Sequence, residues 1–146
     1  MIRQSSRQFP KVVFFDIGNT IVGKKQWLPG AKEFIAALKA KNVRVGLLSN
    51  TGDMDRESLE KLLPEDFDFG YFEESLVMLS SETGVEKPKL GAFSLAVQHS
   101  NCSPWETMFL GETVEETYMA QMAGMHAVRI TDPANDFKTL KKLLVG

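Results

Sequence analysis

The sequence predicts an α/β fold built on a parallel sheet, and two observations support this. Short runs of β-branched or aromatic residues alternate along the chain with longer runs whose apolar residues recur at helical spacing. The first short run, Val12 to Asp16, is apolar until its final residue, as expected where helices cover both faces of a sheet. We therefore expect one domain over residues 1–146, with residues 1–10 poorly ordered.

Each strand and helix is expected from its own local pattern. Strands are expected at residues 12–16, 43–49, 75–79, 107–111 and 126–130. Helices are expected between and after them: one opened by Pro29 and ended by Asn42, one capped by Asp53 and ended by Pro64, one after Pro88, one at residues 113–123 and a last one around Phe137.

The composition is that of an ordinary soluble protein and excludes several functional classes. The chain is 43% hydrophobic and 25% charged with a net charge of −2, so no basic surface for nucleic acid is expected. Cys102 is the only cysteine, which excludes an internal disulfide and favours a reducing compartment. No apolar run is long enough for a signal peptide or a membrane span, so a cytoplasmic location is expected.

Candidate catalytic groups stand where the predicted strands end, which is where open parallel sheets bind ligands. Asp16 ends the first strand, and N–H groups of the next residues can hold a phosphate while the carboxylate attacks it. Ser49 ends the second strand and can donate its hydroxyl to a phosphoryl oxygen. Lys87 can offset negative charge there, and Glu112 and Glu116 after the fourth strand offer the oxygen ligands that Mg²⁺ prefers.

Each of these residues also has an ordinary structural interpretation. Asp16 can cap the turn after its strand, and Ser49 can cap a turn or a helix. A lone lysine such as Lys87 is usually solvated, and Lys89 lies close enough in sequence to take its place. Glutamates in a first helical turn, such as Glu115, favour the helix dipole. The functional interpretation depends on several strand ends carrying these residue types together.

Taken in order, these groups resemble the four motifs of the haloacid dehalogenase-like superfamily, and the resemblance covers nearly the whole chain. The first motif of that family reads Asp-x-Asp-x-Thr/Val, and Asp16 and Thr20 match its ends. Ser49 matches the second motif, and Lys87, which precedes a proline, matches the third. Residues 111–116, Gly-Glu-Thr-Val-Glu-Glu, resemble the fourth motif, Gly-Asp-x-x-x-Asp.

The resemblance implies a fold and a chemistry. The implied fold is a three-layer α/β/α Rossmann-like fold with a five-stranded parallel sheet in the order 5-4-1-2-3. The implied reaction is that of a phosphatase working through an aspartyl-phosphate, with Asp16 as the nucleophile and Ser49 and Lys87 as further catalytic residues. The implied phosphate-binding residues are Ile17, Gly18, Ser49, Asn50 and Lys87. The implied Mg²⁺ ligands are Asp16, the backbone carbonyl of Gly18, Glu112 and Glu116.

Three positions depart from the family pattern. Gly18 stands where the family has the aspartate that protonates the leaving group, and such general acid assistance is typically worth ~10²–10⁴ in rate. We therefore expect slow turnover, or selectivity for good leaving groups such as aryl and acyl phosphates. Glu112 and Glu116 replace two aspartates, and their longer side chains make Mn²⁺ an alternative to Mg²⁺.

The spacing of the motifs leaves no room for a cap domain between Asp16, Ser49 and Lys87. An open site of this kind suits a large phosphorylated substrate, or a homo-oligomer that covers it. Three alternatives remain open: a catalytically impaired domain that binds a phosphorylated ligand or protein partner, a receiver domain, and a dehalogenase. A receiver would carry its acceptor after the third strand, where Ser80 and Ser81 stand, and an open site suits a small haloacid poorly.

Overall fold

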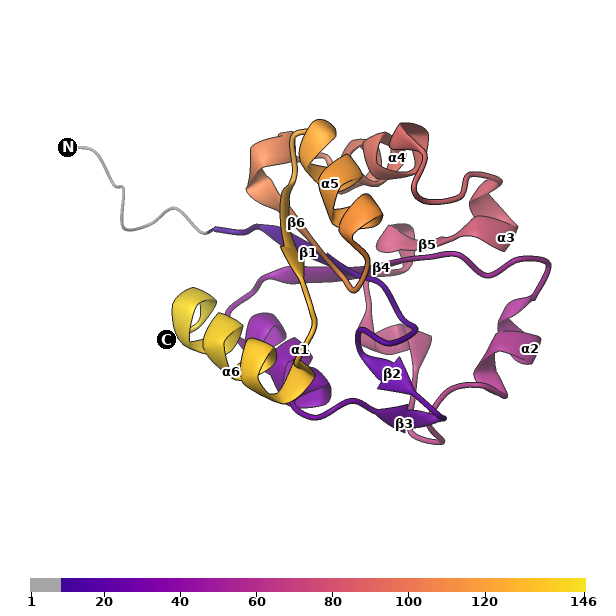
Figure 1. The fold of residues 1–146 in the computed structure, drawn as a ribbon, viewed down its shortest axis with the longest axis horizontal. Helices are drawn as coiled ribbons and strands as arrows, with labels where there is room; N and C mark the ends of the chain where they lie inside the picture. Colours follow the sequence, from indigo (N-terminus) through magenta and orange to yellow (C-terminus); the bar gives the residue numbers. More distant parts are fainter. Residues whose placement is uncertain (1–8) are drawn as a thin grey trace.

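The computed structural model describes residues 9–146 and shows a five-stranded parallel sheet between two layers of helices (Figure 1). In spatial order the strands are β5 (Val77–Leu79), β4 (Arg44–Ser49), β1 (Val12–Phe15), β6 (Thr107–Gly111) and β7 (His126–Arg129). Counted along the chain and read from β7, this order is the expected 5-4-1-2-3, because β2 and β3 label a separate hairpin. Residues 1–8 of the segment expected to be poorly ordered lie outside the described residues.

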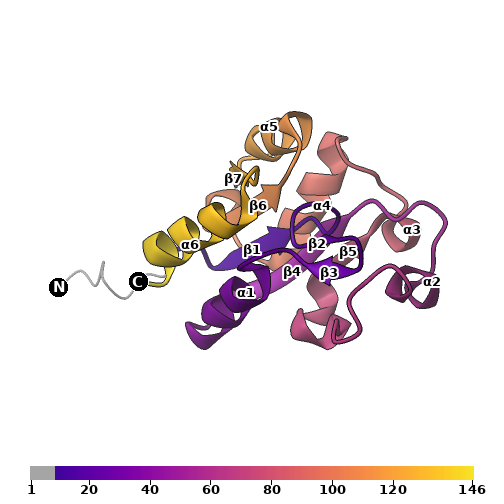
Figure 2. The same ribbon diagram turned by 60° about the horizontal axis from the view of Figure 1, so that its bottom comes forward.

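Each face of the sheet is covered by a pair of helices, as Figures 1 and 2 show. The helices α1 (Ala31–Ala40) and α6 (Pro133–Leu144) lie together on one face, and α4 (Leu90–Ser100) and α5 (Val114–Met122) lie on the other. Phe15 of β1 shares one apolar cluster with Phe34 of α1 and Phe137 of α6, whereas the neighbouring Phe14 belongs to a second cluster with Phe93 of α4. Both faces of β1 are therefore buried, which explains why its sequence is continuously apolar.

The connections between strands are short. The hairpin β2 (Val22–Gly23) and β3 (Gln26–Trp27) precedes α1 between β1 and β4. Between β4 and β5 lie α2 (Arg56–Glu60) and the 3₁₀ turns η2 (Phe69–Tyr71) and η3 (Glu74–Leu76). After β5 come α3 (Ser80–Thr83) and α4, and η4 (Pro104–Glu106) leads into β6. The described residues therefore contain no cap domain, as expected, and none of their helices is long and apolar enough to cross a membrane.

The largest differences from the predicted element boundaries are in α2 and at the start of β5. Asp55 caps α2 in place of the expected Asp53, and its carboxylate accepts a hydrogen bond of 2.8 Å from the Ser58 N–H. The helix starts later because the preceding residues form a turn, in which the Met54 N–H donates to the Thr51 carbonyl. The strand β5 also starts two residues later than expected, because the 3₁₀ turn η3 takes up the preceding residues.

Candidate active site

The parallel sheet brings the predicted strand ends to one edge. Asp16 follows β1, and its backbone N–H donates to the Leu110 carbonyl of β6 at 2.9 Å. Ser49 is the buried last residue of β4, the neighbour of β1 on the other side. Glu112 directly follows β6. The sequence therefore positions these groups through strand length and register alone.

Lys87 is the centre of this edge, and its side chain is only 2% exposed. Its ammonium Nζ lies 2.9 Å from Asp16 Oδ1 and 2.8 Å from Glu116 Oε1, so it forms ion pairs with both carboxylates. The same atom lies 5.2 Å from the centre of the Phe109 ring, which shields it from water. The structure contradicts the interpretation of Lys87 as a solvated lysine, whereas Lys89 is exposed. A buried ammonium of this kind persists because its charge is compensated by two carboxylates.

The backbone of Lys87 is held by the loop that follows β4. The Asn50 side chain donates to the Lys87 carbonyl at 2.9 Å and accepts from the Lys87 N–H at 2.9 Å. This pair of bonds joins the loop after β4 to the loop between α3 and α4. Sequence reasoning assigned Asn50 to phosphate binding and missed this second role for its side chain, because the two residues lie far apart in the sequence.

A group of hydroxyls secures the same loop from the other side. The Thr51 N–H donates to Ser80 Oγ at 2.8 Å, and the Thr51 hydroxyl donates to Ser81 Oγ at 2.8 Å. The Ser81 N–H in turn donates to Thr51 Oγ1 at 3.0 Å. These three residues were not predicted to serve the site. The sequence feature that could have predicted their role is the Ser-Ser pair directly after β5, because the last residue of β5 pairs with Ser49 in the sheet.

The loop after Asp16 is a tight turn organised by Ile17. The Ile17 carbonyl accepts the N–H groups of Ile21 and Val22 at 3.0 and 3.1 Å, and the Ile17 N–H donates to Asp16 Oδ1 at 2.9 Å. Gly18 is exposed within this turn, and a Cβ atom added there would meet no atom within 4 Å. The turn therefore holds the Asp16 carboxylate in place without requiring glycine at position 18.

The side chains of the implied metal ligands do not all converge on one point. Glu116 faces Lys87, and Glu112 offers its backbone carbonyl to Arg129 Nε at 2.8 Å. Among residues 9–146, no three acidic, histidine or cysteine side chains form a group that could hold a metal ion. Mg²⁺ commonly keeps several waters and binds one or two carboxylates together with substrate phosphate. Asp16 and Gly18 follow β1, and Glu112 follows the neighbouring strand β6. Their oxygen atoms fit that mode of binding.

A hollow of about 260 Å³ opens beside the implied phosphate-binding residues. One side is formed by Ile17, Gly18, Ser49 and Asn50. The rest is formed by the hairpin around Lys24, by Leu59 of α2 and by Leu62 and Leu63 just after that helix. The hollow therefore joins a polar floor to an apolar wall. This arrangement can hold the phosphate of an ester together with its apolar leaving group.

Comparison with known proteins agrees with this geometry. Residues 13–88, just over half of the chain, match the family model of haloacid dehalogenase-like hydrolases. The chain is also 30% identical over 103 residues to a glyceraldehyde 3-phosphate phosphatase from Methanothermobacter thermautotrophicus. That match covers 70% of this chain and 43% of the relative, so the chain spans less than half of the relative's length.

Two solved structures share the fold at low sequence identity. An uncharacterized protein from Corynebacterium glutamicum has a TM-score of 0.72 and 21% identity, covering 92% of this chain and 95% of that one. A hydrolase of the same superfamily from Ehrlichia chaffeensis has a TM-score of 0.75 and 16% identity, covering 94% and 99%. Because the family model matches more than half of its length, the chain belongs to the haloacid dehalogenase-like hydrolases.

Proposed function

We propose that the protein is a metal-dependent phosphatase with Asp16 as its nucleophile. The observation that carries this proposal is the buried Lys87 ammonium, which lies between Asp16 and Glu116 at the carboxyl edge of the sheet. A cation held this firmly beside the Asp16 carboxylate offsets the negative charge of an approaching phosphate. The relative named as a phosphatase supports the same class of reaction.

The reaction would run in two steps. An oxygen of Asp16 attacks phosphorus, and the bond from phosphorus to the leaving oxygen breaks, with the electron pair departing on that oxygen. Water then attacks phosphorus, loses a proton to solvent, and releases inorganic phosphate while the Asp16 carboxylate is restored. Ser49 and the loop N–H groups of residues 18 and 50 would hold the phosphoryl oxygens, while the Ile17 N–H, which donates to Asp16 Oδ1, would orient the nucleophile. Mg²⁺ or Mn²⁺, held by Asp16 and the Gly18 carbonyl with Glu112 and Glu116 nearby, would neutralise further negative charge.

Gly18 and the hollow beside it determine which leaving groups the site favours. Gly18 has no proton to give, so a leaving oxygen must depart as an anion or take its proton from water. The apolar wall formed by Leu59, Leu62 and Leu63 favours an apolar body on that oxygen. Both features favour aryl phosphates over phosphates of simple alcohols.

Steady-state assays on para-nitrophenyl phosphate and glycerol phosphate, with Mg²⁺ or Mn²⁺, test this function. We expect the aryl phosphate to be hydrolysed much faster, and we expect Asp16→Asn to abolish the activity. Asp53→Asn, which changes an exposed aspartate outside the site, should keep it. Activity that survives Asp16→Asn would exclude the proposed nucleophile, and equal rates on both substrates would exclude the selectivity.

A second candidate function is binding without turnover, and the glycine at position 18 favours it. Such a domain would hold a phosphorylated ligand or protein partner at the same loops. Beryllium fluoride with Mg²⁺ separates the two functions, because it forms a phosphoryl-like adduct only on a competent nucleophile. An adduct on Asp16 detected by fluorine NMR supports the phosphatase, whereas phosphate binding without any adduct supports the binding domain.

A further inference from the structure

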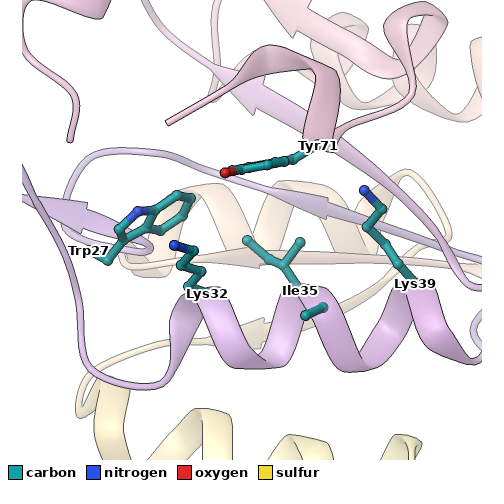
Figure 3. A pocket seen from close by; sticks show the side chains of 6 residues that line it. Trp27, Lys32, Ile35, Lys39 and Tyr71 are labelled. Atoms are coloured by element: carbon teal, nitrogen blue, oxygen red, sulfur yellow. The ribbon is translucent and has the colours of Figure 1, made fainter. Parts of the chain in front are cut away.

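A second hollow, of about 330 Å³, lies between α1 and the η2 turn and shares no lining residue with the hollow beside Gly18 and Ser49. It is lined by Trp27, Lys32, Ile35, Ala36, Lys39 and Tyr71. Figure 3 shows the Tyr71 ring above α1, with Trp27 toward one end and Lys39 toward the other. We call this hollow the Tyr71 slot. Its floor is the apolar surface of Ile35 and Ala36 on α1.

The aromatic walls of the Tyr71 slot are fixed by contacts behind them. The Trp27 ring stacks on Phe67, with ring centres 5.3 Å apart, and its Nε1–H donates to Asp66 Oδ1 at 2.8 Å. The Tyr71 hydroxyl donates to the Asp66 carbonyl at 2.8 Å. The slot is therefore formed before any ligand enters, as small-molecule sites usually are.

The two lysines of the slot differ in their partners. Lys32 forms an ion pair with Asp66, so its charge is already compensated. Lys39 Nζ instead lies 5.8 Å from the centre of the Tyr71 ring, and no ion pair among residues 9–146 includes Lys39. Lys39 is thus the cation of the slot that a ligand anion can reach without displacing a carboxylate.

We propose that the Tyr71 slot binds a planar aromatic anion, with its ring beneath Tyr71 and its acid group at Lys39. The volume of about 330 Å³ is at the small end of ligand sites, so one ring or two fused rings fit best. An aromatic ring gains contact with Tyr71 and Trp27 and buries the apolar floor. A carboxylate or phosphate on that ring pairs with Lys39. This site is independent of the proposed phosphatase activity.

Titration of the full-length protein with naphthoate tests the proposal, with naphthamide as the uncharged control. The chain has two tryptophans, Trp27 in the slot and the exposed Trp105, so a proton–nitrogen spectrum shows two indole signals. Trp105→Phe assigns them. We expect naphthoate to move the Trp27 signal saturably while the Trp105 signal stays fixed, and naphthamide to bind more weakly. A Trp27 signal that does not move, or that moves equally with naphthamide, would overturn the proposal.

Three variants separate the slot from other binding surfaces. Lys39→Met should weaken naphthoate binding by about fivefold, the upper range for an exposed ion pair. Lys138→Met, which removes an exposed lysine of α6, should leave the binding constant unchanged. Ala36→Phe should fill the slot and abolish the Trp27 shift while the rest of the spectrum stays native, and Ala36→Leu serves if the larger residue unfolds the chain. Undiminished binding to the filled slot contradicts the assignment.

Discussion

At the level of single residues, the backbone conformation does not require glycine at position 18, whereas the proposed reaction is affected by the missing side chain. Its φ lies outside the left-handed region, and the space around its missing Cβ is open. The turn after β1 would therefore accept an aspartate at this position without strain. In the proposed mechanism, glycine at this position supplies no proton donor but keeps the backbone carbonyl that is proposed to bind metal.

We predict that Gly18→Asp accelerates hydrolysis of glycerol phosphate. General acid assistance typically contributes ~10²–10⁴ in rate, and it matters most where the leaving oxygen is a poor anion. The gain in kcat should therefore be large on glycerol phosphate and small on para-nitrophenyl phosphate. Gly18→Asn is the matched control, since an amide fills the same space without serving as an acid. Equal gains from both substitutions would show that the side chain acts by shape and not by proton transfer.

The Lys87 ion pairs predict a large loss of stability for Lys87→Met. Removing one partner of a buried ion pair typically costs about 3–5 kcal/mol, because the remaining charges lose their compensation. Here the loss leaves Asp16 and Glu116 as two neighbouring carboxylates. Urea unfolding should show the loss, and adding Glu116→Gln should restore part of it. Lys89→Met, at an exposed lysine nearby, should have no comparable effect. If Glu116→Gln restores nothing, the two carboxylates are not in repulsion.

At the level of elements, β4 is joined closely to the segment that leads into β5. A Cβ atom at Gly46 would lie 2.6 Å from the Leu76 carbonyl oxygen, so only glycine allows this approach. At the start of β4, Arg44 donates from Nε and Nη2 to the two oxygens of Glu73 at 2.8 and 2.6 Å. Arg44 Nη1 also donates to the Ser100 carbonyl at the end of α4, at 2.6 Å. One arginine thus connects three elements.

This arginine predicts a pH-dependent stability. The hydrogen bonds from Arg44 hold the pKa of Glu73 below its ordinary value of 4.5. Because the pKa is lower in the folded state, the stabilisation is present above the unfolded pKa and is lost as the pH falls through the folded pKa. Glu73→Gln should therefore lower the free energy of unfolding at neutral pH, by up to about 1 kcal/mol for a partly exposed pair.

Urea unfolding of Glu73→Gln and of the parent protein across the acidic range measures this difference. The two stabilities should converge as the pH falls below the ordinary pKa of a glutamate. Glu65→Gln, at an exposed glutamate outside every ion pair of the described residues, should match the parent at each pH. A difference that persists at low pH would mean that Glu73 acts through packing.

The central strands were predicted well because a strand that is buried on both faces has a continuously apolar sequence. β6 has the predicted bounds, and β1 differs only at its last residue. The start of α2 was wrong because Asp53 and Asp55 are both good caps, and only the turn from Thr51 decides between them. The Tyr71 slot could not be predicted, because its walls come from a hairpin, a helix and a 3₁₀ turn, and the turn lies more than thirty residues further along the chain.

At the level of the whole molecule, the sheet divides the interior into two apolar clusters, and the candidate site lies at its edge. Buried side chains of β1 alternate between the clusters, so the strand at the centre of the sheet holds both layers of helices. Lys87 forms ion pairs with both Asp16 and Glu116, so a cation of the chain itself lies between these two carboxylates. The fold should therefore be stable whether or not a metal is bound.

This independence predicts that chelation separates activity from stability. A metal that binds only the folded state adds about 0.4 kcal/mol when its concentration equals its dissociation constant. In a solution holding the metal near its dissociation constant, EDTA should thus abolish hydrolysis of para-nitrophenyl phosphate while the free energy of unfolding, measured with urea, falls by less than about 1 kcal/mol. Excess Mg²⁺ should restore the rate. A much larger fall in stability would mean that the metal holds the strand ends together, and that the ion pairs of Lys87 do not suffice to compensate Asp16 and Glu116.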